Sequence, residues 1–307
     1  MKTPFDNVPL FDGHCDTLLR LNGNLFRNSL HVDLERASVF SPYAQFFAIF
    51  HPSDAVFDSA YKSFLFETKK AGQQLELCLN AENAAHTALK GAAAAFLSVE
   101  GAHVLGCDEE NLLHAHSLGV RSIALTWNNA SVISGTCVED SNRGLSEKGR
   151  SFVFKCEELG IIIDVSHLSD PGFWDVYEIS SAPFIASHSN SRAVFKHPRN
   201  ISDEMFKAIC EKGGTAGINL YSAFLGQRPD ISTIIAHIEH WLELDGAGHI
   251  ALGCDFDGCE ELPENFTGIE SLMNLYEAMI SKNYPEQLVR DVFYNNLMRV
   301  VSNICGM

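Results

Sequence analysis

The sequence predicts a single α/β domain over residues 1–307, folded as a (β/α)8 barrel with extra helices near its C-terminal end. Three observations predict this fold. Eight short runs of β-branched or apolar residues recur along the chain, several intervening segments have helical spacing, and no linker or repeat interrupts them. Strands that alternate with helices form a parallel sheet, and eight such strands can close into a barrel.

The eight predicted strands are short runs that end in polar residues. They lie at residues 9–13, 43–50, 93–99, 122–127, 161–165, 183–187, 214–221 and 249–254. The main alternative is an open doubly wound sheet, which would predict a glycine-rich phosphate-binding loop after the first strand. The segment that follows this strand, GHCDT, lacks that pattern. The closed barrel is therefore favoured.

Helical spacing follows several of these strands. It occupies residues 110–119, 146–160, 201–214 and 231–246, and several of these segments end in glycine, which is typical of helix C-termini. Two further helices are predicted near the end of the chain, one around 269–280 and one from Pro285. The last helix has an apolar face formed by Val289, Val292, Phe293, Leu297, Val300 and Ile304.

The composition excludes several classes of function. The chain has 22 Lys and Arg against 39 Asp and Glu, a formal net charge of −17, which argues against nucleic acid as a partner. No stretch approaches the roughly 20 apolar residues that span a bilayer, and the first residues lack the features of a signal peptide. Nine scattered cysteines without a CxxC pair indicate reduced thiols. We therefore expect a cytoplasmic protein with no membrane partner.

Residues that can bind metal ions follow five of the predicted strands. Barrel enzymes carry their sites at the C-terminal ends of the strands, so these positions indicate where the site should lie. The candidates are His14, Asp16, Glu100, His167, His188 and Asp255. Imidazole and carboxylate groups are common ligands of divalent metals. The pattern therefore predicts a metal centre at this end of the barrel.

Spacing supports several of these candidates. Residues two apart on a strand point to the same face, so His14 and Asp16 can bind one ion while the residue between them points away. A carboxylate at a strand end, such as Glu100, can bridge two divalent ions. Taken singly, His167 or His188 would more often be a hydrogen-bonded core histidine. Their positions at successive strand ends favour a role as ligands.

Four other histidines are interpreted as structural. His114 and His116 lie two apart on a predicted helix, where their side chains point in nearly opposite directions and cannot share an ion. His237 and His240 could face the same way, but their amphipathic helix is expected outside the barrel.

Eight motifs, in this order and at these separations, resemble those of one known family. They are DGHCDTLL, SVEGAHVLG, LTWNNAS, IIDVSHLSD, ASHSNSRAVFKHPRNISD, GINLY, ALGCDFDG and NNLMRVV. Together they extend from residue 9 to residue 301 and resemble the membrane (renal-type) dipeptidases, peptidase family M19. The resemblance implies a metal-dependent hydrolase with a (β/α)8 barrel and two zinc ions per chain, acting on dipeptides.

The resemblance also implies a role for each matching residue. The implied metal ligands are His14 and Asp16 for one zinc ion, Glu100 as the bridge, and His167 and His188 for the other. Asp255 matches the catalytic acid and base beside the metals, and Arg199, in HPRN, matches the residue that binds the free carboxylate of the substrate. Arg192 is interpreted as structural.

Two positions depart from the family pattern. Many relatives carry a histidine, thought to help polarise the scissile carbonyl, where this chain has Trp127 in LTWNN. The resemblance then implies that this task falls to zinc and Asn128, which makes Trp127 and Asn128 candidate substrate-binding residues. Phe224 stands where some relatives have tyrosine.

The predicted function is a zinc-dependent dipeptidase. In a site with two divalent ions, a hydroxide that bridges the metals would attack the peptide carbonyl while zinc stabilises the oxyanion. Asp255 would transfer the proton to the leaving amine, and Arg199 would bind the C-terminal carboxylate. The relatives also imply that a C-terminal D-residue is accepted. The resemblance further implies a bacterial cytosolic form and a possible homodimer.

Two alternatives remain open. One is a related binuclear amidohydrolase acting on N-acyl amino acids or another small amide. The usual signature of such enzymes, H-x-H on the first strand and a lysine after the fourth, is absent from this sequence. The other is a barrel that binds ligands without catalysis, against which the complete set of candidate ligands argues. Metal content would separate the second alternative from the enzymes.

Overall fold

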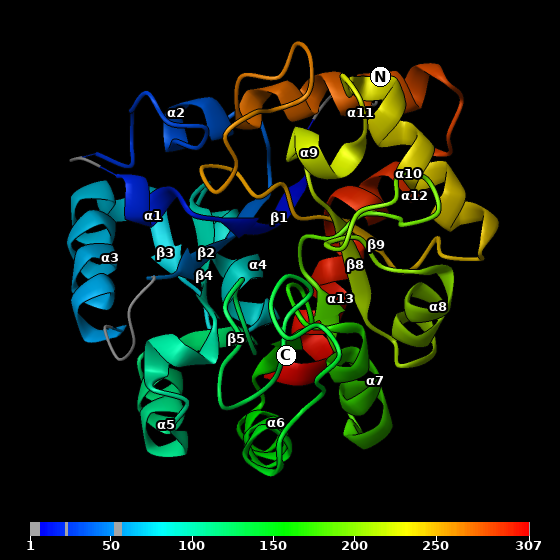
Figure 1. The fold of residues 1–307 in the computed structure, drawn as a ribbon. Helices are drawn as coiled ribbons and strands as arrows, with labels where there is room; N and C mark the ends of the chain where they lie inside the picture. The colour runs from blue at the N-terminus through cyan, green and yellow to red at the C-terminus, as the bar shows by residue number, and fades with distance from the viewer. Residues whose placement is uncertain (1–6, 22–23, 52–56, 307) are drawn as a thin grey trace.

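A closed ring of eight parallel strands forms the centre of the molecule. The computed structural model describes residues 7–21, 24–51 and 57–306, and Figure 1 shows the helices arranged around the strands. The ring contains β1 (Leu10–Cys15), β2 (Tyr43–Ile49), β4 (Ala93–Glu100), β5 (Val120–Ala124), β6 (Ile162–Asp164), β7 (Ile185–Ala186), β8 (Thr215–Ile218) and β9 (Ile250–Leu252). Pairing of β2 with β4 and of β1 with β9 closes the ring. The predicted (β/α)8 barrel is therefore confirmed.

One short strand lies outside the ring. Strand β3 (Leu75–Leu77) pairs in parallel with residues 93–95, at the start of β4. The remainder of the same edge of β4, from Leu97 to Glu100, pairs with β5. This strand was not predicted, because three residues carry too little periodicity to be recognised. The eight ring strands all overlap the predicted runs, although β6, β7, β8 and β9 are shorter than expected.

Helices connect the strands on the outside of the ring. The predicted helical segments correspond to α5 (Glu109–Ser117), α6 (Glu147–Leu159), α8 (Asp203–Glu211) and α10 (Ile231–Glu243). Ser146, Ser202 and Asp230 begin three of these helices, and each accepts a hydrogen bond from a backbone N–H of the first turn. The structure adds helices that were not predicted: α1 (Thr17–Arg20), α2 (Leu34–Ala37), α3 (Phe57–Ala71), α4 (Ala81–Leu89), α7 (Asp170–Ile179) and α9 (Ser222–Leu225).

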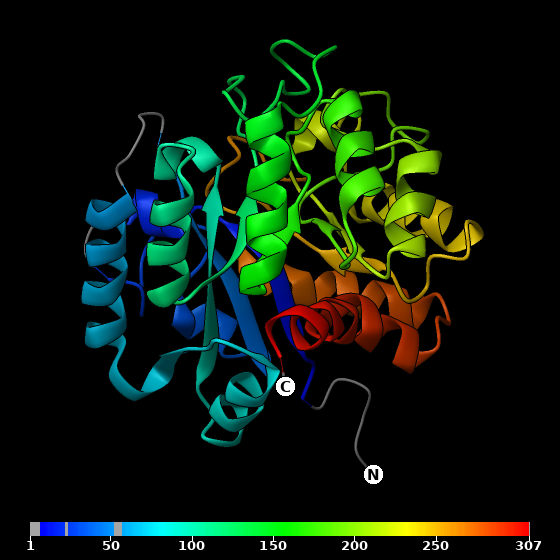
Figure 2. The same cartoon turned by 90° about the horizontal axis from the view of Figure 1, so that it is seen from below.

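The end of the chain closes one end of the barrel. The predicted helix from Pro285 consists of α12 (Glu286–Arg290), a π-helical turn (Asp291–Asn295) and α13 (Asn296–Cys305), preceded by α11 (Leu272–Ser281). Helix α13 contacts β1, β6, β8 and β9, and Figure 2 shows the orange and red helices gathered at one end of the strands, opposite the long green loops. The extra C-terminal helices were predicted, and this capping position gives them a structural role.

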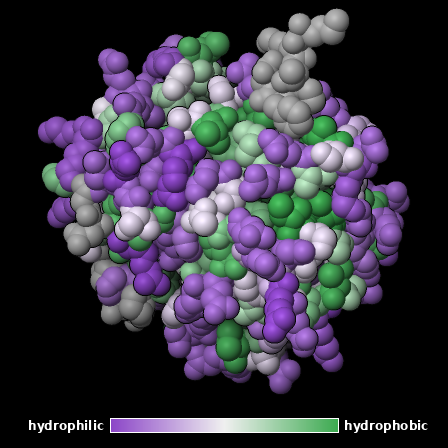
Figure 3. Space-filling view, turned by 90° about the horizontal axis from the view of Figure 1, so that it is seen from above, coloured by the Kyte–Doolittle hydropathy of each residue, from purple (hydrophilic) through white to green (hydrophobic). Residues whose placement is uncertain are grey.

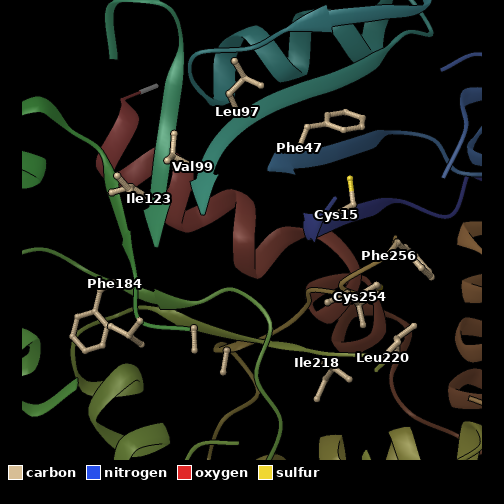
Figure 4. Packing of buried hydrophobic residues seen from close by; sticks show 14 of the residues in the cluster. Cys15, Phe47, Leu97, Val99, Ile123, Phe184, Ile218, Leu220, Cys254 and Phe256 are labelled. Atoms are coloured by element: carbon tan, nitrogen blue, oxygen red, sulfur yellow. The ribbon is translucent and has the colours of Figure 1, made fainter. Parts of the chain in front are cut away.

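Two apolar layers surround the strand backbones. Inside the barrel, the ring of Phe11 stacks on those of Phe46 and Phe96, which are tilted relative to each other, with all centroids 5.3–5.4 Å apart. These rings pack with Leu297 and Val300 of α13. We call these five residues the floor cluster. Outside the barrel, side chains such as those labelled in Figure 4 fill the space between strands and helices.

The visible surface is mostly hydrophilic. On the face in Figure 3, hydrophilic residues predominate and hydrophobic ones lie among them. Within the residues that the structure describes, no helix is both long and apolar enough to cross a membrane.

Candidate metal centre

Six polar side chains converge at the C-terminal end of the barrel. His14 belongs to β1 and Glu100 is the last residue of β4, whereas the others lie one to three residues beyond the nearest strand. The six residues are His14, Asp16, Glu100, His167, His188 and Asp255, all buried. The structure thus brings together every residue that the sequence singled out as a candidate ligand or as the acid and base.

The donor atoms of this cluster lie close enough to one another to bind the same metal ion. The Nε2 atom of His14 is 3.7 Å from a carboxylate oxygen of Asp16, 3.7 Å from Glu100 and 4.0 Å from Asp255. The same Glu100 oxygen, Oε1, lies 3.0 Å from Nε2 of His167 and 3.6 Å from Nε2 of His188. Two groups of three donors each fall within 4.8 Å, one formed by His14, Glu100 and His188 and the other by His14, Asp16 and Asp255.

The geometry at the first strand differs from the expected one. Asp16 is not on the strand but begins helix α1, and its carboxylate makes no capping bond. The pairing of β1 with β2 shifts register between Asp12 and Cys15, as in a β-bulge. The extra residue allows Phe11 and His14, three positions apart, both to face the barrel interior. Cys15 points away into the strand–helix layer, as predicted (Figure 4).

Two observations indicate that the cluster fits a metal ion. Nε2 of His14 and Oδ1 of Asp16 are buried without a hydrogen-bond partner, an unfavourable state that a cation would relieve. A Cβ atom on Gly258 would come within 2.2 Å of Asp16 and 2.4 Å of Asp255, so glycine leaves room for both carboxylates. Nitrogen and oxygen donors of this kind suit zinc and other first-row divalent metals.

The electrostatics of the cluster also favour a cation. Burial lowers the pKa of His14, but the carboxylates of Glu100, Asp16 and Asp255 outweigh burial and raise that pKa to about 10. Burial raises the pKa of Glu100 well above its ordinary value, and it raises the pKa of Asp255 to about 6. For the other two imidazoles, burial lowers the pKa well below the ordinary value. Three buried carboxylates thus share one imidazole as their closest source of positive charge.

The backbone is unusual at the loops that carry these donors. His167, Asp255 and Asp257 have φ angles of 70°, 59° and 67°, in the left-handed region that non-glycine residues rarely adopt. Such conformations cost free energy and persist where the surrounding structure fixes them. Here Asp257 accepts hydrogen bonds from the hydroxyl of Thr17 at 2.5 Å and the backbone N–H of His31 at 2.7 Å. These bonds join the loop after β9 to the segments that follow β1.

Two amides contact the cluster from outside. The Nδ1 atom of His167 is 3.0 Å from Oδ1 of Asn128, so the ring can donate to this amide and direct Nε2 toward the donors. Asn128 was predicted to bind substrate, and its contact with a candidate ligand adds a second possible role. The amide of Asn219 donates to Oδ2 of Asp255 at 2.9 Å and to the backbone oxygen of His188 at 3.2 Å. Asn219 was missed, although GINLY lies at a strand end.

Arg199 lies beside the cluster with few partners. Its side chain is buried, donates one long hydrogen bond of 3.4 Å to the backbone oxygen of His188, and stands 5.5 Å from the ring of Phe224. Among the described residues, no carboxylate lies within ion-pair distance of Arg199, whereas Arg192 forms a two-pronged ion pair with Asp170. A buried guanidinium without an anionic partner is suited to an anionic ligand.

Trp127 and the remaining histidines occupy different surroundings. Trp127 is partly buried and packs on Phe50, with ring centroids 4.5 Å apart, at the ends of β5 and β2. The four histidines interpreted as structural all lie outside the cluster. For example, His237 bonds the backbone oxygen of Leu225 at 3.0 Å, and His240 pairs with Asp203 at 2.8 Å.

Comparisons with known proteins point to one family. A model of the family described as membrane dipeptidase (peptidase family M19) matches residues 3–305. An uncharacterized protein of Klebsiella pneumoniae, from the 5′ region of pqqA, is 31% identical over 243 residues, which cover 75% of this chain and 89% of that protein.

Two solved structures are also similar. Dipeptidase AC, a metallopeptidase of family M19, matches with a TM-score of 0.90 and 29% identity, covering 98% of this chain and 100% of its own. A metallopeptidase from Rhodobacter sphaeroides, bound to a phosphinate mimic of the dipeptide L-Ala-D-Ala, matches with a TM-score of 0.88 and 28% identity, covering 97% of this chain and 100% of its own.

Proposed function

The chain belongs to the membrane dipeptidase family, peptidase family M19, and from this premise we propose that it hydrolyses dipeptides with two zinc ions. One observation carries the proposal: six buried imidazole and carboxylate groups converge at the strand ends, next to a buried arginine without an anionic partner. The first group can hold metal, and the second can hold a substrate carboxylate.

The proposed ligands divide into two sets. His14 and Asp16 would hold one ion, His167 and His188 the other, and Glu100 would contact both. Bound divalent ions supply Lewis-acid chemistry, which activates water and stabilises negative charge on a carbonyl oxygen. The position of Glu100 supports the bridging role, because its Oε1 atom lies within 3.7 Å of a nitrogen from each set.

Asp255 is the proposed acid and base. Asn219 holds its Oδ2 atom at 2.9 Å, while Oδ1 lies 4.0 Å from Nε2 of His14 and so faces the cluster. A carboxylate held in this way can take a proton from water and deliver it to the leaving amine without rotating. Burial raises the pKa of Asp255 to about 6, which brings both protonation states within reach near neutral pH.

Arg199 is the proposed carboxylate site and limits substrate length. A guanidinium can bind a carboxylate through two parallel hydrogen bonds, so the C-terminal residue of a dipeptide would be held at a fixed distance from the metals. The R. sphaeroides metallopeptidase holds a mimic of L-Ala-D-Ala. This supports the further proposal that the present chain accepts a D-residue at the second position.

One observation favours a second candidate substrate. The aromatic pair of Phe50 and Trp127, with centroids 4.5 Å apart, stands close to Asn128 and hence to His167. Such a pair would bind an apolar acyl group as readily as an amino-acid side chain. An N-acyl amino acid would use the same carboxylate site at Arg199 and is therefore the alternative.

The test compares three substrates on metal-stripped and zinc-loaded protein. These are an L,L-dipeptide, the same dipeptide with a C-terminal D-residue, and its N-acetylated form. Release of amino acids from the two dipeptides, dependent on zinc and absent with the acetylated form, is the expected result. Parallel loading with Mn²⁺ and Co²⁺, with metal counted per chain, tests the choice of zinc.

Two outcomes would contradict the proposal. If only the acetylated form is cleaved, the substrates are N-acyl amino acids and not free dipeptides. If none of the three is cleaved by protein with about two zinc ions bound per chain, the proposed peptidase activity is wrong and only the proposed metal site stands.

A further inference from the structure

We infer that Asp164 and Ser187 position His188 for metal binding by fixing which ring nitrogen carries the proton. A histidine binds a metal through a nitrogen that carries no hydrogen, so one tautomer of His188 is competent and the other is not. The inference rests on the proposed metal site, but its central prediction concerns the metal-free protein.

A chain of hydrogen bonds leads from the barrel interior to His188. The hydroxyl of Ser187 donates to Oδ2 of Asp164 and lies 2.6 Å from Nδ1 of the His188 ring. The opposite nitrogen of that ring, Nε2, faces the cluster, 3.0 Å from Nε2 of His167 and 3.6 Å from Oε1 of Glu100. All three members of the chain are at least 95% buried, so water does not compete for these bonds.

The direction of these bonds follows from the number of protons. An ionised carboxylate only accepts hydrogen bonds, and a hydroxyl has one proton to donate. Because Ser187 gives its proton to Asp164, its oxygen is left to accept from His188. The proton of the neutral ring is therefore on Nδ1, and the lone pair of Nε2 points toward the other candidate ligands.

The Asp164 carboxylate is itself held in place. Its Oδ1 atom accepts backbone N–H groups of Ser166 and Ser187, each at 2.9 Å. In the part of the chain that the structure describes, no cationic side chain lies within ion-pair distance of this buried group. Burying a carboxylate costs free energy unless a nearby positive charge or hydrogen bonds compensate its charge. A cation bound beyond the His188 ring would be stabilised by that charge, transmitted through the hydroxyl and the imidazole.

A purely structural role is the competing explanation. Strand β7 has only two residues, and the register of β6 with β7 is a single pair, Asp164 with Ile185. The carboxylate could simply replace missing sheet bonds between these strands. Asp164→Asn separates the two roles, because the amide oxygen still accepts both backbone N–H groups while the amide nitrogen becomes a donor.

The substitution Asp164→Asn should reverse the direction of the hydrogen bonds from residue 164 through Ser187 to His188. The new amide would donate to the Ser187 oxygen, so the hydroxyl would turn its proton toward Nδ1 of His188 and force the ring proton onto Nε2. In metal-free protein labelled with ¹⁵N-histidine, the tautomer is read by NMR, and His188→Gln assigns the signal. We expect Nδ1–H in the native protein and Nε2–H in Asp164→Asn.

Metal binding provides the second measurement. Competition with a chelator, followed by counting the zinc retained per chain, should show that Asp164→Asn weakens binding by about 10- to 100-fold, the usual effect of altering a group that orients a ligand. The matched control is Ser166→Ala. The Ser166 hydroxyl accepts from the backbone N–H of His188 at 3.1 Å and makes no bond to a ring. Among the described residues, its only contact with the side chains of Asp164, Ser187 and His188 is a long one, 3.4 Å to the Ser187 hydroxyl, so its removal should leave the tautomer unchanged and affect zinc less.

Several outcomes overturn the inference. An unchanged Nδ1–H tautomer in Asp164→Asn would do so, as would an equal loss of zinc in Ser166→Ala. Should Asp164→Asn fail to fold, Ser187→Ala decides: without the hydroxyl, we expect a mixture of tautomers and weaker zinc binding, and a pure Nδ1–H form would refute the relay. A failure of dipeptide cleavage would leave these measurements intact, so the two proposals fail separately.

Discussion

The two ends of the barrel are built from the same strands and differ in every physical respect. At one end, the three rings of the floor cluster pack against its two residues from α13, Leu297 and Val300. At the other end, buried imidazoles and carboxylates converge, with two donor atoms that have no partner. The floor lowers the free energy of the folded state, whereas the polar end raises it in the absence of a cation.

Strand β4 shows this division within eight residues. Phe96, Ser98 and Glu100 are two apart and face the barrel interior, so successive positions lead from the floor through a polar layer to the metal centre. Along β4, a single interior residue, Ser98, therefore separates the floor cluster from the candidate metal centre. Substitutions in the floor cluster should therefore change the free energy of unfolding, whereas substitutions at the polar end should change kcat or KM.

The largest effect is expected for Asp255→Asn. Loss of the proposed acid and base should lower kcat for dipeptide hydrolysis by roughly 10²- to 10⁴-fold. The melting temperature should change little, since the amide keeps the shape of the carboxylate. Steady-state kinetics and zinc content per chain check this. Activity within tenfold of the native protein would exclude the role, and loss of zinc would instead make Asp255 a ligand, in line with its place beside His14 and Asp16.

Phe96→Ala should give the opposite result. Removing this buried ring from the floor cluster should lower the free energy of unfolding by about 3–5 kcal/mol, while kcat and KM at low temperature stay close to native values. Denaturant titration measures the first quantity. Phe154→Ala is the control, because this ring on α6 is 54% exposed and its loss should cost little. A large drop in kcat in folded Phe96→Ala would show that the two ends are coupled.

Arg199→Gln should act on binding. A charge-assisted hydrogen bond contributes about 1.5–3 kcal/mol, so KM should rise by about 10- to 100-fold. For a dipeptide with an amidated C-terminus, native protein and Arg199→Gln should have similar KM values. The matched control is Arg192→Gln, which removes a half-buried ion pair with Asp170 and should leave KM unchanged. An equal rise of KM in both variants would count against the carboxylate site.

The smallest effect is expected for Ser202→Ala. This serine caps α8 by accepting the backbone N–H of Met205, and it lies three residues from Arg199. Its loss should cost about 1 kcal/mol of folding free energy and leave the kinetics unchanged. Thermal unfolding and KM, measured on the same sample, check this. A change in KM would show that the polar end depends on the capping of neighbouring helices.

The sequence predicted the strands better than it predicted the surroundings of the candidate metal centre. The eight strands were found because apolar runs repeat along the chain, and the barrel is confirmed. The six candidate ligands meet in the structure, while their individual roles stay predictions. Their approach could be inferred because parallel strand ends lie together in a barrel.

What the sequence concealed depends on distant contacts. Asn219 contacts Asp255, and Asn128 contacts His167. Asp164, at the end of β6, accepts from Ser187, which follows the neighbouring strand β7. Each of these residues is an ordinary polar side chain in its own segment, and the pairing of neighbouring parallel strands brings it to its partner. The β-bulge that turns both Phe11 and His14 inward is likewise a property of the pairing of β1 with β2.

Closure of the ring between β1 and β9 has a consequence for how the protein is made. The donors come from both sides of this seam, with His14 on β1, Asp16 directly after it and Asp255 after β9. No partly synthesised barrel can hold them all, so a ribosome must release nearly the whole chain before the complete centre exists. An ion that binds only the closed ring stabilises that state by mass action. A metal ion bound at this centre would therefore stabilise the finished barrel relative to any shorter chain.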